Sequence, residues 1–404
     1  MDLTRATPPL LKHLNERTVL EAIRAGAPIS RAEISRRVGI SKPTVSLALR
    51  SLEDAGLVRE AAQGPDGPSY GAVFYEPVPD AAFVVGLDLG SRFLRGAVAD
   101  LAGRIRARQD VELRGADADG ALEAIAALHA SLVDAASLPL ERIDGVVLGI
   151  PGVVETKGTL RLTSPYIEGL EGRAFADEVR TRVEMAVTLD NDINLAAVGE
   201  RWAGVARGVD DFAFLSIGTG AGMGLVLGGE LHRGTHGAAG EIDWALSGAA
   251  NDLDPSAPGV ESLVAELGWD GPRRRSTPPY DVREVFTAAR RGDDVARAIV
   301  ERVAHRIAAH IAPVAAVADP ELVVLGGGLG MNADLLLEPV RALLREWLPY
   351  PPRVEISSLG ESAVLMGAVA TGLQSALDNV FVNRTTQTSS TSAPAARAGI
   401  PARS

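Results

Sequence analysis

The chain has 404 residues, a formal net charge of −12 and no cysteine, which leaves room for two or three domains and excludes disulfides and thiolate metal ligands. No basic segment followed by an apolar stretch opens the sequence, and no run of about 18 apolar residues interrupts it. We therefore expect no signal peptide, no contact with a membrane and a cytoplasmic location.

The charge is unevenly distributed along the sequence. Residues 1–60 contain ten Lys or Arg and seven Asp or Glu, a balance of +3, so the remaining residues carry −15. A mildly basic head on an acidic body favours a DNA-binding module attached to a different domain.

Three helices are predicted near the start, after an unstructured stretch at residues 1–9. Asn15 is expected to cap the first helix. Ser30 begins a capping box for the second helix, and Ser41 caps the third, where Pro43 fits because a missing N–H costs nothing in the first turn. Two helices joined by a tight turn form the helix-turn-helix pattern, whose last helix enters the major groove of DNA.

The third helix has an apolar face, formed by Val45, Ala48, Leu49 and Leu52, and an opposite polar face. We expect DNA contacts from the polar face, from the cap and from the start of the second helix, through Arg31, Ser41, Lys42, Thr44, Ser46 and Arg50. Arg36 and Arg37 are either phosphate contacts or solvated surface residues. A small helical packing domain is the alternative to a DNA-binding head.

Two short strands at 57–60 and 73–75 are predicted to form a wing, which completes an all-α/winged helix-turn-helix domain at residues 1–75. Residues 76–82 contain two prolines and are expected to form a linker. From residue 378 to 404 the chain is rich in Thr, Ser, Ala and Pro, so we expect a disordered tail.

From Phe83 onward the pattern changes to strands alternating with helices, which is typical of an α/β domain. Expected strands lie at 83–87, 94–99, 104–113, 145–150, 187–190, 212–231 and 322–325, with helices at 118–136, 295–318 and 362–377. The layout of the first half recurs in the second, so the body should have two similar lobes.

Three of these strands end in glycine-bearing turns: Asp88-Leu89-Gly90, Gly218-Thr219-Gly220 and Gly326-Gly327-Gly328. Ligands of open α/β folds bind beyond the carboxyl ends of strands, and glycines let backbone N–H groups approach an anion closely. Two such turns facing each other could hold the phosphates of a nucleotide, and Asp88 could organise a metal-bound water. The alternative for each is an ordinary β-turn.

Two carboxylates stand where a sugar could be bound. Asp192 follows a strand and opens a helix, so it could accept the proton of a hydroxyl that attacks a phosphate; a simple helix N-terminal charge is the alternative. Glu241 follows the small-residue loop 234–240 and could accept hydrogen bonds from two sugar hydroxyls.

These motifs together resemble the ROK family (repressors, open reading frames and sugar kinases), and the architecture resembles its repressor branch, over residues 13–377. The most specific stretch is the glycine loop 217–220 followed by 231–242, which contains Arg-Gly and Gly-Ala-Ala-Gly-Glu. Further support comes from 149–152, 191–194, 199–200 and 325–328.

The resemblance implies an actin-like (ribonuclease H-like) two-lobed sugar-kinase fold behind the winged helix-turn-helix domain. The smaller lobe would span 83–190 plus 362–377, and the larger lobe 191–361. It also implies that Asn191, Asp192, Glu241 and Glu261 contact sugar hydroxyls, and that Asp192 is the catalytic base in kinase members.

Departures from the kinase pattern limit what can be carried over. Kinase members continue the first turn with Gly-Thr, where this chain has Ser91 and Arg92. Many members have a histidine where this chain has Trp244, and a zinc-binding cysteine cluster where 247–260 contains no cysteine. We therefore expect no zinc or other metal, and expect Trp244 to offer a stacking face to a sugar of open identity.

The sequence thus predicts a sugar-responsive DNA-binding transcriptional regulator, a repressor of carbohydrate uptake or catabolism genes. Its expected partners are double-stranded operator DNA, a sugar or sugar-phosphate effector and its own copies in a homodimer or homotetramer, with no cofactor required. One alternative is an ATP-dependent sugar kinase that retained a DNA-binding head and uses ATP and Mg²⁺. Another is a regulator whose body only dimerises.

Overall fold

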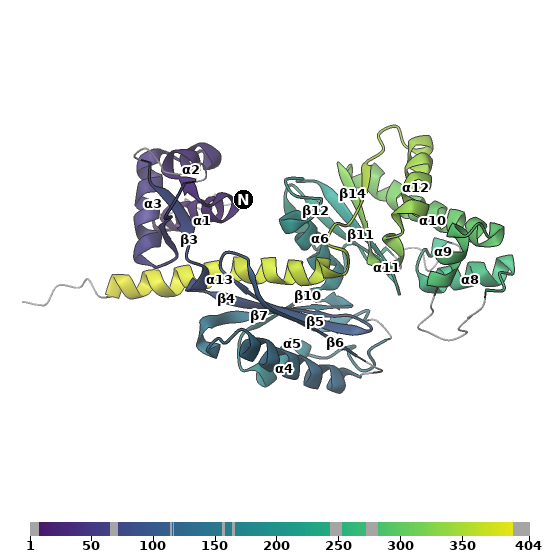
Figure 1. The fold of residues 1–404 in the computed structure, drawn as a ribbon, viewed down its shortest axis with the longest axis horizontal. Coiled ribbons are helices and arrows are strands. Elements are labelled where there is room, and N and C mark those ends of the chain that lie inside the picture. The colour runs from purple at the N-terminus through teal and green to yellow at the C-terminus, as the bar shows by residue number, and fades with distance from the viewer. Residues whose placement is uncertain are drawn as a thin grey trace, which may run out of the picture.

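The computed structural model describes residues 8–64, 72–113, 115, 117–155, 158–163, 166–242, 253–271 and 282–390. Within these ranges a winged-helix head is followed by two lobes, each built on a five-stranded sheet (Figure 1). None of the helices described in these ranges is long and apolar enough to span a bilayer.

The head contains α1 (Pro8–Gly26), α2 (Arg31–Val38) and α3 (Lys42–Asp54). The predicted caps of α2 and α3 are confirmed, because Ser30 Oγ accepts a hydrogen bond from Glu33 N and Ser41 Oγ accepts one from Thr44 N. The predicted start of the first helix was wrong: α1 begins at Pro8 and Asn15 lies inside it. Proline is favoured in a first helical turn, which explains how two consecutive prolines can begin this helix.

A three-stranded sheet completes the head in the order β1-β3-β2. Its strands are β1 (Ile29–Ser30), β2 (Val58–Glu60) and β3 (Phe74–Pro77), and all pairings are antiparallel. The two predicted wing strands are confirmed, while their tip at 65–71 lies outside the described residues. The expected linker at 76–82 is folded. Strand β3 runs to Pro77, a 3₁₀ turn follows at Pro79–Ala81, and Ala81 and Ala82 are buried.

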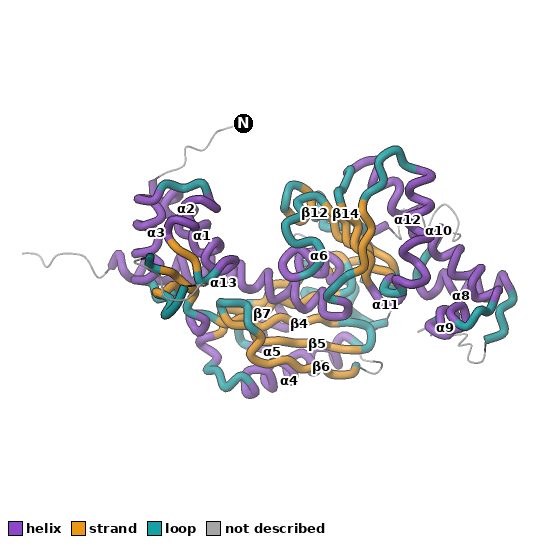
Figure 2. The backbone as a smooth tube through the Cα atoms, turned by 45° about the horizontal axis from the view of Figure 1, so that its top comes forward, coloured by secondary structure: helices purple, strands orange, loops and turns teal. Residues whose placement is uncertain are grey.

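The smaller lobe has the strand order β10-β7-β4-β5-β6. The strands are β4 (Phe83–Leu89), β5 (Phe93–Asp100), β6 (Ile105–Glu112), β7 (Ile143–Ile150) and β10 (Val187–Asn191), with a small β8 (Val153–Val154) and β9 (Leu160–Arg161) pair beside them. Helices α4 (Ala118–Ala135) and α5 (Phe175–Val183) cover one face (Figure 2). Strands β4, β7 and β10 are parallel, so their carboxyl ends meet at one edge.

The larger lobe has the order β13-β12-β11-β14-β15. Its strands are β11 (Phe212–Ile217), β12 (Ala221–Leu227), β13 (Glu230–His232), β14 (Leu322–Gly326) and β15 (Arg353–Ile356). Its helices are α8 (Ala257–Leu267), α9 (Arg283–Arg290), α10 (Asp294–Ala318), α11 (Gly327–Gly330) and α12 (Ala333–Trp347), which share one large apolar core with the sheet.

Helix α6 (Asp192–Ala203) lies between the lobes, packed against β12 and against the long helix α13 (Ala363–Ser390). The α6–α13 crossing is unusually close, because a Cβ on Gly199 would overlap the carbonyl of Ala363, and a Cβ on Gly367 would overlap that of Leu195. Glycine at both positions lets the two backbones touch.

Helix α13 also connects the body to the head. One buried apolar cluster includes Leu20 and Ile23 of α1 together with Leu373 and Leu377 of α13. Helix α13 continues to Ser390. The prediction that this helix ends at 377 was therefore wrong, and so was the prediction of disorder for residues 378–390. No glycine or proline occurs between Gly372 and Pro394, so nothing in the backbone stops the helix there. Residues 391–404 lie outside the described residues.

Candidate functional site

Helix α3 exposes a face that suits the major groove. Val45, Ala48, Leu49 and Leu52 are buried as predicted, and Lys42 and Arg50 are exposed on the other side. Their cationic ends are available to phosphates or to base edges.

The other predicted DNA contacts also have partners within the head. Ser41 Oγ and Thr44 Oγ1 lie 2.8 Å apart in the cap of α3. Ser46 Oγ donates to Lys42 O at 2.9 Å and accepts from Arg31 Nη1 at 3.1 Å, so Arg31 ties α2 to α3. DNA contact by these four residues stays a prediction, and the hydrogen bonds give each of them a structural role.

Arg36 and Arg37 both pair with Glu33 on α2. These exposed pairs contribute little to stability, and they leave the choice between phosphate contact and surface arginine open. A residue that the sequence reasoning missed is Leu47 of α3, which is 63% exposed. Apolar side chains in the major groove contact thymine methyl groups. The sequence could have pointed to Leu47, because a leucine on the polar face of an amphipathic helix has no place in the core.

In the body, acidic side chains lie at the carboxyl edge of the smaller sheet. Gly149 of β7 pairs in register with Asp88 of β4 on one side and with Asp190 of β10 on the other. Asp192 follows two residues later, as the first residue of α6. The register therefore brings Asp88, Asp190 and Asp192 to one edge of the smaller sheet.

Asp192 is electrostatically coupled to two other carboxylates. Burial raises its pKa to about 7, and the negative charges of Asp88 and Glu241 add to this shift, while its hydrogen bond from Ile193 N opposes it. We call Asp88, Asp192 and Glu241 the carboxylate cluster. Repelling negative charges of this kind are relieved by a proton or by hydroxyl groups that donate hydrogen bonds.

Glu241 is carried into the cluster by the loop that follows β13. Gly240 O accepts a hydrogen bond from Met223 N of β12 at 2.9 Å, and Gly240 has φ 93°, which only glycine adopts easily. Helix α6 packs on the same strand, where a Cβ on Gly224 would come within 2.9 Å of Ala197 Cβ. Strand β12 therefore brings the start of α6 and Glu241 to one place.

Asn191 has a structural role beside its predicted sugar contact. Its Oδ1 accepts hydrogen bonds from Ile193 N and Asn194 N at 2.9 and 3.0 Å, and its Nδ2 donates to Gly152 O at 3.0 Å. It thereby caps α6 and fastens the 151–152 turn to it. Asn191, Asn194, Asp190 and Arg233 line a pocket of about 260 Å³ beside β10.

The two glycine turns of the larger lobe lie side by side. Ser216 of β11 pairs with Gly326 of β14, and a Cβ on Gly218 would lie 3.7 Å from Gly328 N. Gly327 has φ 75° and packs against the backbone of Ile217. Both turns end parallel strands of the same sheet, so they do not face each other across the two lobes. The third turn belongs to the other sheet, where Gly90 N donates to Phe93 O at 3.0 Å.

Asp88 is already engaged by an arginine that the sequence reasoning missed. Arg95 Nη1 lies 3.4 Å from Asp88 Oδ2, and Arg95 Nη2 lies 2.7 Å from Glu361 Oε2. Burial raises the pKa of Asp88 to about 6 even though Arg95 acts in the opposite direction. This ion pair lies beside the Ser91 and Arg92 turn, and a metal-bound water on Asp88 stays a prediction.

The segment expected to replace a zinc cluster is held by hydrogen bonds. The buried Arg306 of α10 donates to Asp254 O at 2.7 Å and Gly259 O at 2.9 Å, and His310 Nε2 lies 3.0 Å from Leu253 O. Burial lowers the pKa of His310. These contacts fix the start of α8, which also hydrogen-bonds to the Gly218 turn through Ala257 N.

Glu261 lies on this helix, half-buried and one turn from its start. Trp244, the predicted stacking residue, lies outside the described residues, so both sugar contacts stay predictions. Among the residues that the structure describes, no group of three or more His, Asp or Glu is arranged to hold a metal ion.

Comparison with known proteins places this geometry in a family. A model described as "ROK family" matches residues 84–374. The chain belongs to the ROK family. A second model, described as "Winged helix-turn-helix DNA-binding", matches residues 13–59 of the head of this ROK protein.

Some relatives match most of the chain, and others match its body. The xylose repressor of Caldicellulosiruptor bescii is 26% identical over 382 residues, which cover 89% of this chain and 96% of that protein. A crystal structure of a ROK family transcriptional regulator, described as a homologue of the E. coli MLC protein, has a TM-score of 0.75 at 23% identity and covers 93% of this chain and 99% of its own, which shows the shared fold. A ROK family glucokinase from Streptomyces griseus, solved with glucose and AMPPNP, has a TM-score of 0.59 at 27% identity and covers 72% of this chain and 100% of its own.

Proposed function

We propose that this ROK protein is a sugar-responsive transcriptional repressor of genes for carbohydrate uptake or catabolism. The observation that carries the proposal is the single apolar core that runs from the head into α13. Helix α13 packs closely on α6, and α6 begins at Asp192 of the carboxylate cluster. A DNA-reading helix is thus mechanically joined to the place where a polyhydroxy ligand would bind.

The relatives support both the DNA-binding role of the head and the sugar-binding role of the body. A xylose repressor matches along most of the chain, and a glucokinase solved with glucose matches the body. In the proposed mechanism, hydroxyls of the effector donate hydrogen bonds to Asp192 and Glu241 and relieve their mutual repulsion. Asn191, Glu261 and Trp244 complete the sugar site. The effector acts by preferring one arrangement of α6 and α13 over another.

Repression requires paired heads, so we propose a homodimer or homotetramer that reads half-sites one helical turn apart, or a multiple of that distance. Leu47 would reach base edges, and Lys42 and Arg50 would contact base edges or phosphates. Arg31, Ser41, Thr44 and Ser46 would position the helix on phosphates. The effector could be a neutral sugar or a sugar phosphate. The proposed mechanism needs no ATP, Mg²⁺ or zinc. The protein would act in the cytoplasm.

The test is binding of the full-length protein to DNA fragments selected from the producing genome, measured by fluorescence anisotropy at low salt. We expect specific binding that at least one sugar of a panel including xylose and glucose weakens by about tenfold or more, which corresponds to a coupling free energy of about 1.4 kcal/mol. Absence of DNA binding under every low-salt condition would refute the proposal. DNA binding that no sugar changes, together with an unchanged melting temperature across the panel, would favour a body that only dimerises.

A second candidate is a sugar kinase that retained its head. The observation in its favour is the raised pKa of Asp192, about 7, which suits a general base at neutral pH. The Arg95–Asp88 pair and the Ser91–Arg92 turn oppose it. Sugar-dependent ADP release that disappears in Asp192→Asn would establish kinase activity.

A further inference from the structure

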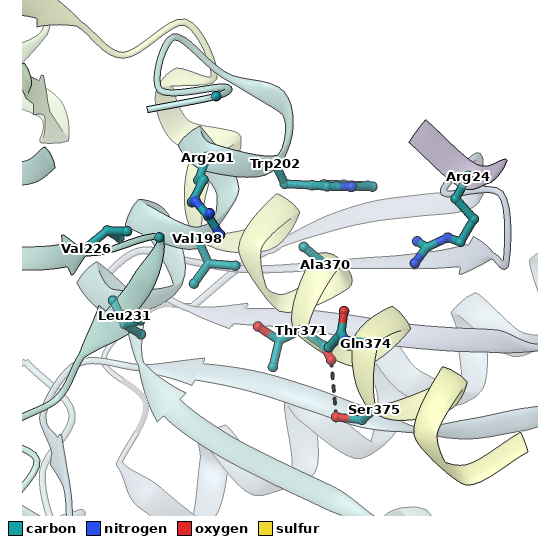
Figure 3. Close-up of a pocket in the computed structure, with 12 residues that line it drawn as sticks. Arg24, Val198, Arg201, Trp202, Val226, Leu231, Ala370, Thr371, Gln374 and Ser375 are labelled. Atoms are coloured by element: carbon teal, nitrogen blue, oxygen red, sulfur yellow. Dashed lines mark hydrogen bonds between the residues drawn. The ribbon is translucent and has the colours of Figure 1, made fainter. Parts of the chain in front are cut away.

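A second pocket lies where the head meets the body. Its volume is about 520 Å³, within the range of roughly 300–1,000 Å³ typical of small-molecule sites. Helix α1 of the head, helix α6, the β12–β13 hairpin and helix α13 form its walls (Figure 3). We call it the junction pocket. Its polar and aromatic lining comprises Arg24, Arg201, Trp202, Thr371, Gln374 and Ser375.

Two arginines give the junction pocket a positive character. Arg24 reaches it from the head, and its Nε donates to Leu101 O at 3.0 Å. Arg201 reaches it from α6, with Nη2 at 3.3 Å from Asp210. No carboxylate is among the residues that line the pocket, and the acidic neighbours of the two arginines, Asp210 and Glu21, lie behind the lining.

Arg24 in particular lacks full solvation. Burial lowers its pKa, and the neighbouring Glu21 only partly offsets this effect. Glu21 is itself 3.1 Å from Arg17 and lies 3.3 Å from Gln374 Nε2. A poorly hydrated guanidinium gains most from a hydrogen-bonding anion such as a phosphate, which it binds in a bidentate fashion.

The remaining walls suit a body with a ring and several hydroxyls. The indole of Trp202 extends from α6 across the pocket toward Arg24 (Figure 3). Its far edge packs on the β5–β6 turn, where a Cβ on Gly103 would come within 2.9 Å of the ring, so the indole is held in place. Opposite it, α13 presents the polar groups of Thr371, Gln374 and Ser375.

We propose that the junction pocket is a second ligand site, which takes a small phosphorylated sugar with its phosphate on Arg24 and its ring against Trp202. Arg201 takes a polar or charged group at the other end. Because Arg24 belongs to α1 and the other groups belong to the body, an occupied pocket ties the head to the body in one orientation. The effect on DNA binding rests on the proposed function, but ligand binding itself does not.

The test is isothermal titration calorimetry of the full-length protein with glucose 6-phosphate and ribose 5-phosphate, compared with glucose and inorganic phosphate. We expect one sugar phosphate to bind once per chain, with a change in tryptophan fluorescence that Trp202→Phe removes. Arg24→Gln and Arg201→Gln should each weaken binding by about tenfold or more. Arg207→Gln is the matched control, since this exposed arginine is outside the lining and should leave affinity unchanged.

If Arg24→Gln disturbs the head, Arg201→Gln is the deciding variant, because Arg201 belongs to α6 of the body. Failure of both sugar phosphates to bind would overturn the proposal, as would binding that both arginine variants leave unaltered. Equal affinity for inorganic phosphate would overturn the assignment of a sugar. Asp192→Asn separates the two proposed sites, since it should abolish the response to a neutral sugar and leave sugar-phosphate binding at the junction intact.

Discussion

Arg233 and Asp190 form an ion pair that joins the two lobes. Arg233 follows β13 of the larger sheet, and its Nη2 lies 2.5 Å from Oδ2 of Asp190 in β10 of the smaller sheet. Asp190 is 9% exposed at its side chain and Arg233 is 50% exposed. The pair therefore fixes a nearly buried carboxylate next to the carboxylate cluster.

Removing this arginine should loosen the contact between the lobes. Arg233→Gln leaves Asp190 without its cation, and because Arg233 is half exposed we expect a loss of about 1 kcal/mol in the free energy of unfolding. Urea denaturation measures it, with Arg207→Gln as the exposed control. A loss no larger than that of the control would show that the pair does not hold the lobes together.

The stability of the protein should depend on the protonation of Asp192. Its pKa is raised from 3.8 to about 7 in the folded protein, chiefly by burial, so the folded state binds the proton more tightly than the unfolded state. This contribution is fully present below about pH 4 and is lost as the pH rises to about 7. Asp192→Asn should therefore reduce the fall in stability between pH 5 and pH 8 by about 1–3 kcal/mol. This range follows from about 1.4 kcal/mol per unit of pKa shift, reduced because the side chain is partly exposed.

Urea midpoints at several pH values measure this effect, and the exposed Asp134→Asn on α4 is the control. A pH dependence in Asp192→Asn equal to that of the wild type would contradict the raised pKa.

Leu47 should contribute to DNA recognition without contributing to the fold. Because it is 63% exposed, Leu47→Ala should leave the stability of the head within about 0.5 kcal/mol and weaken specific DNA binding by about 1 kcal/mol. Leu49→Ala, at a position only 2% exposed, should instead destabilise the head by about 2–5 kcal/mol. Fluorescence anisotropy and thermal melts separate the two effects, and unchanged affinity in Leu47→Ala would remove it from the interface.

Lys42 and Arg50 should act through charge. Replacing either by glutamine is expected to weaken DNA binding and, if the side chain contacts a phosphate, to lower the slope of log K against log salt by about 1. An unchanged slope together with relaxed sequence preference would instead assign that residue to a base edge. The titration is repeated at several salt concentrations with the specific and a scrambled fragment.

The glycine contacts between α6 and α13 should tolerate no side chain. Gly367→Ala places a methyl group on the carbonyl of Leu195, and we expect a loss of about 1–3 kcal/mol together with a weaker effect of sugar on DNA binding. Gly328→Ala is the control, because a Cβ there meets nothing within 4 Å. Normal coupling in a folded Gly367→Ala variant would show that the crossing does not transmit the signal.

Arg306 should be necessary for the start of α8. Arg306→Met leaves two carbonyl oxygens, of Asp254 and Gly259, without their donor, and a loss of about 3 kcal/mol is expected. On the same helix, Arg302 pairs with Glu266 at the surface, so Arg302→Gln should cost at most about 1 kcal/mol. Similar melting temperatures for the two variants would argue against an anchoring role.

Much of this protein was determined by local sequence. Ser30 and Ser41 specify helix starts through their own side chains, and the apolar spacing of Val45, Leu49 and Leu52 identifies the buried face of α3, because both signals act within one or two turns. Glycine turns at strand ends and the loop before Glu241 likewise identified the family and the two-sheet body.

Other features were decided only by the tertiary structure, because they depend on contacts between residues far apart in the chain. The linker at 76–82 is folded since Ala81 and Ala82 enter the core shared with α13. Arg95 reaches Asp88, Arg233 reaches Asp190 and Arg306 reaches the start of α8 through the folding of separate elements. Arg24 and Trp202 meet at one pocket only because α1 packs against the body, and no spacing in the sequence records that approach.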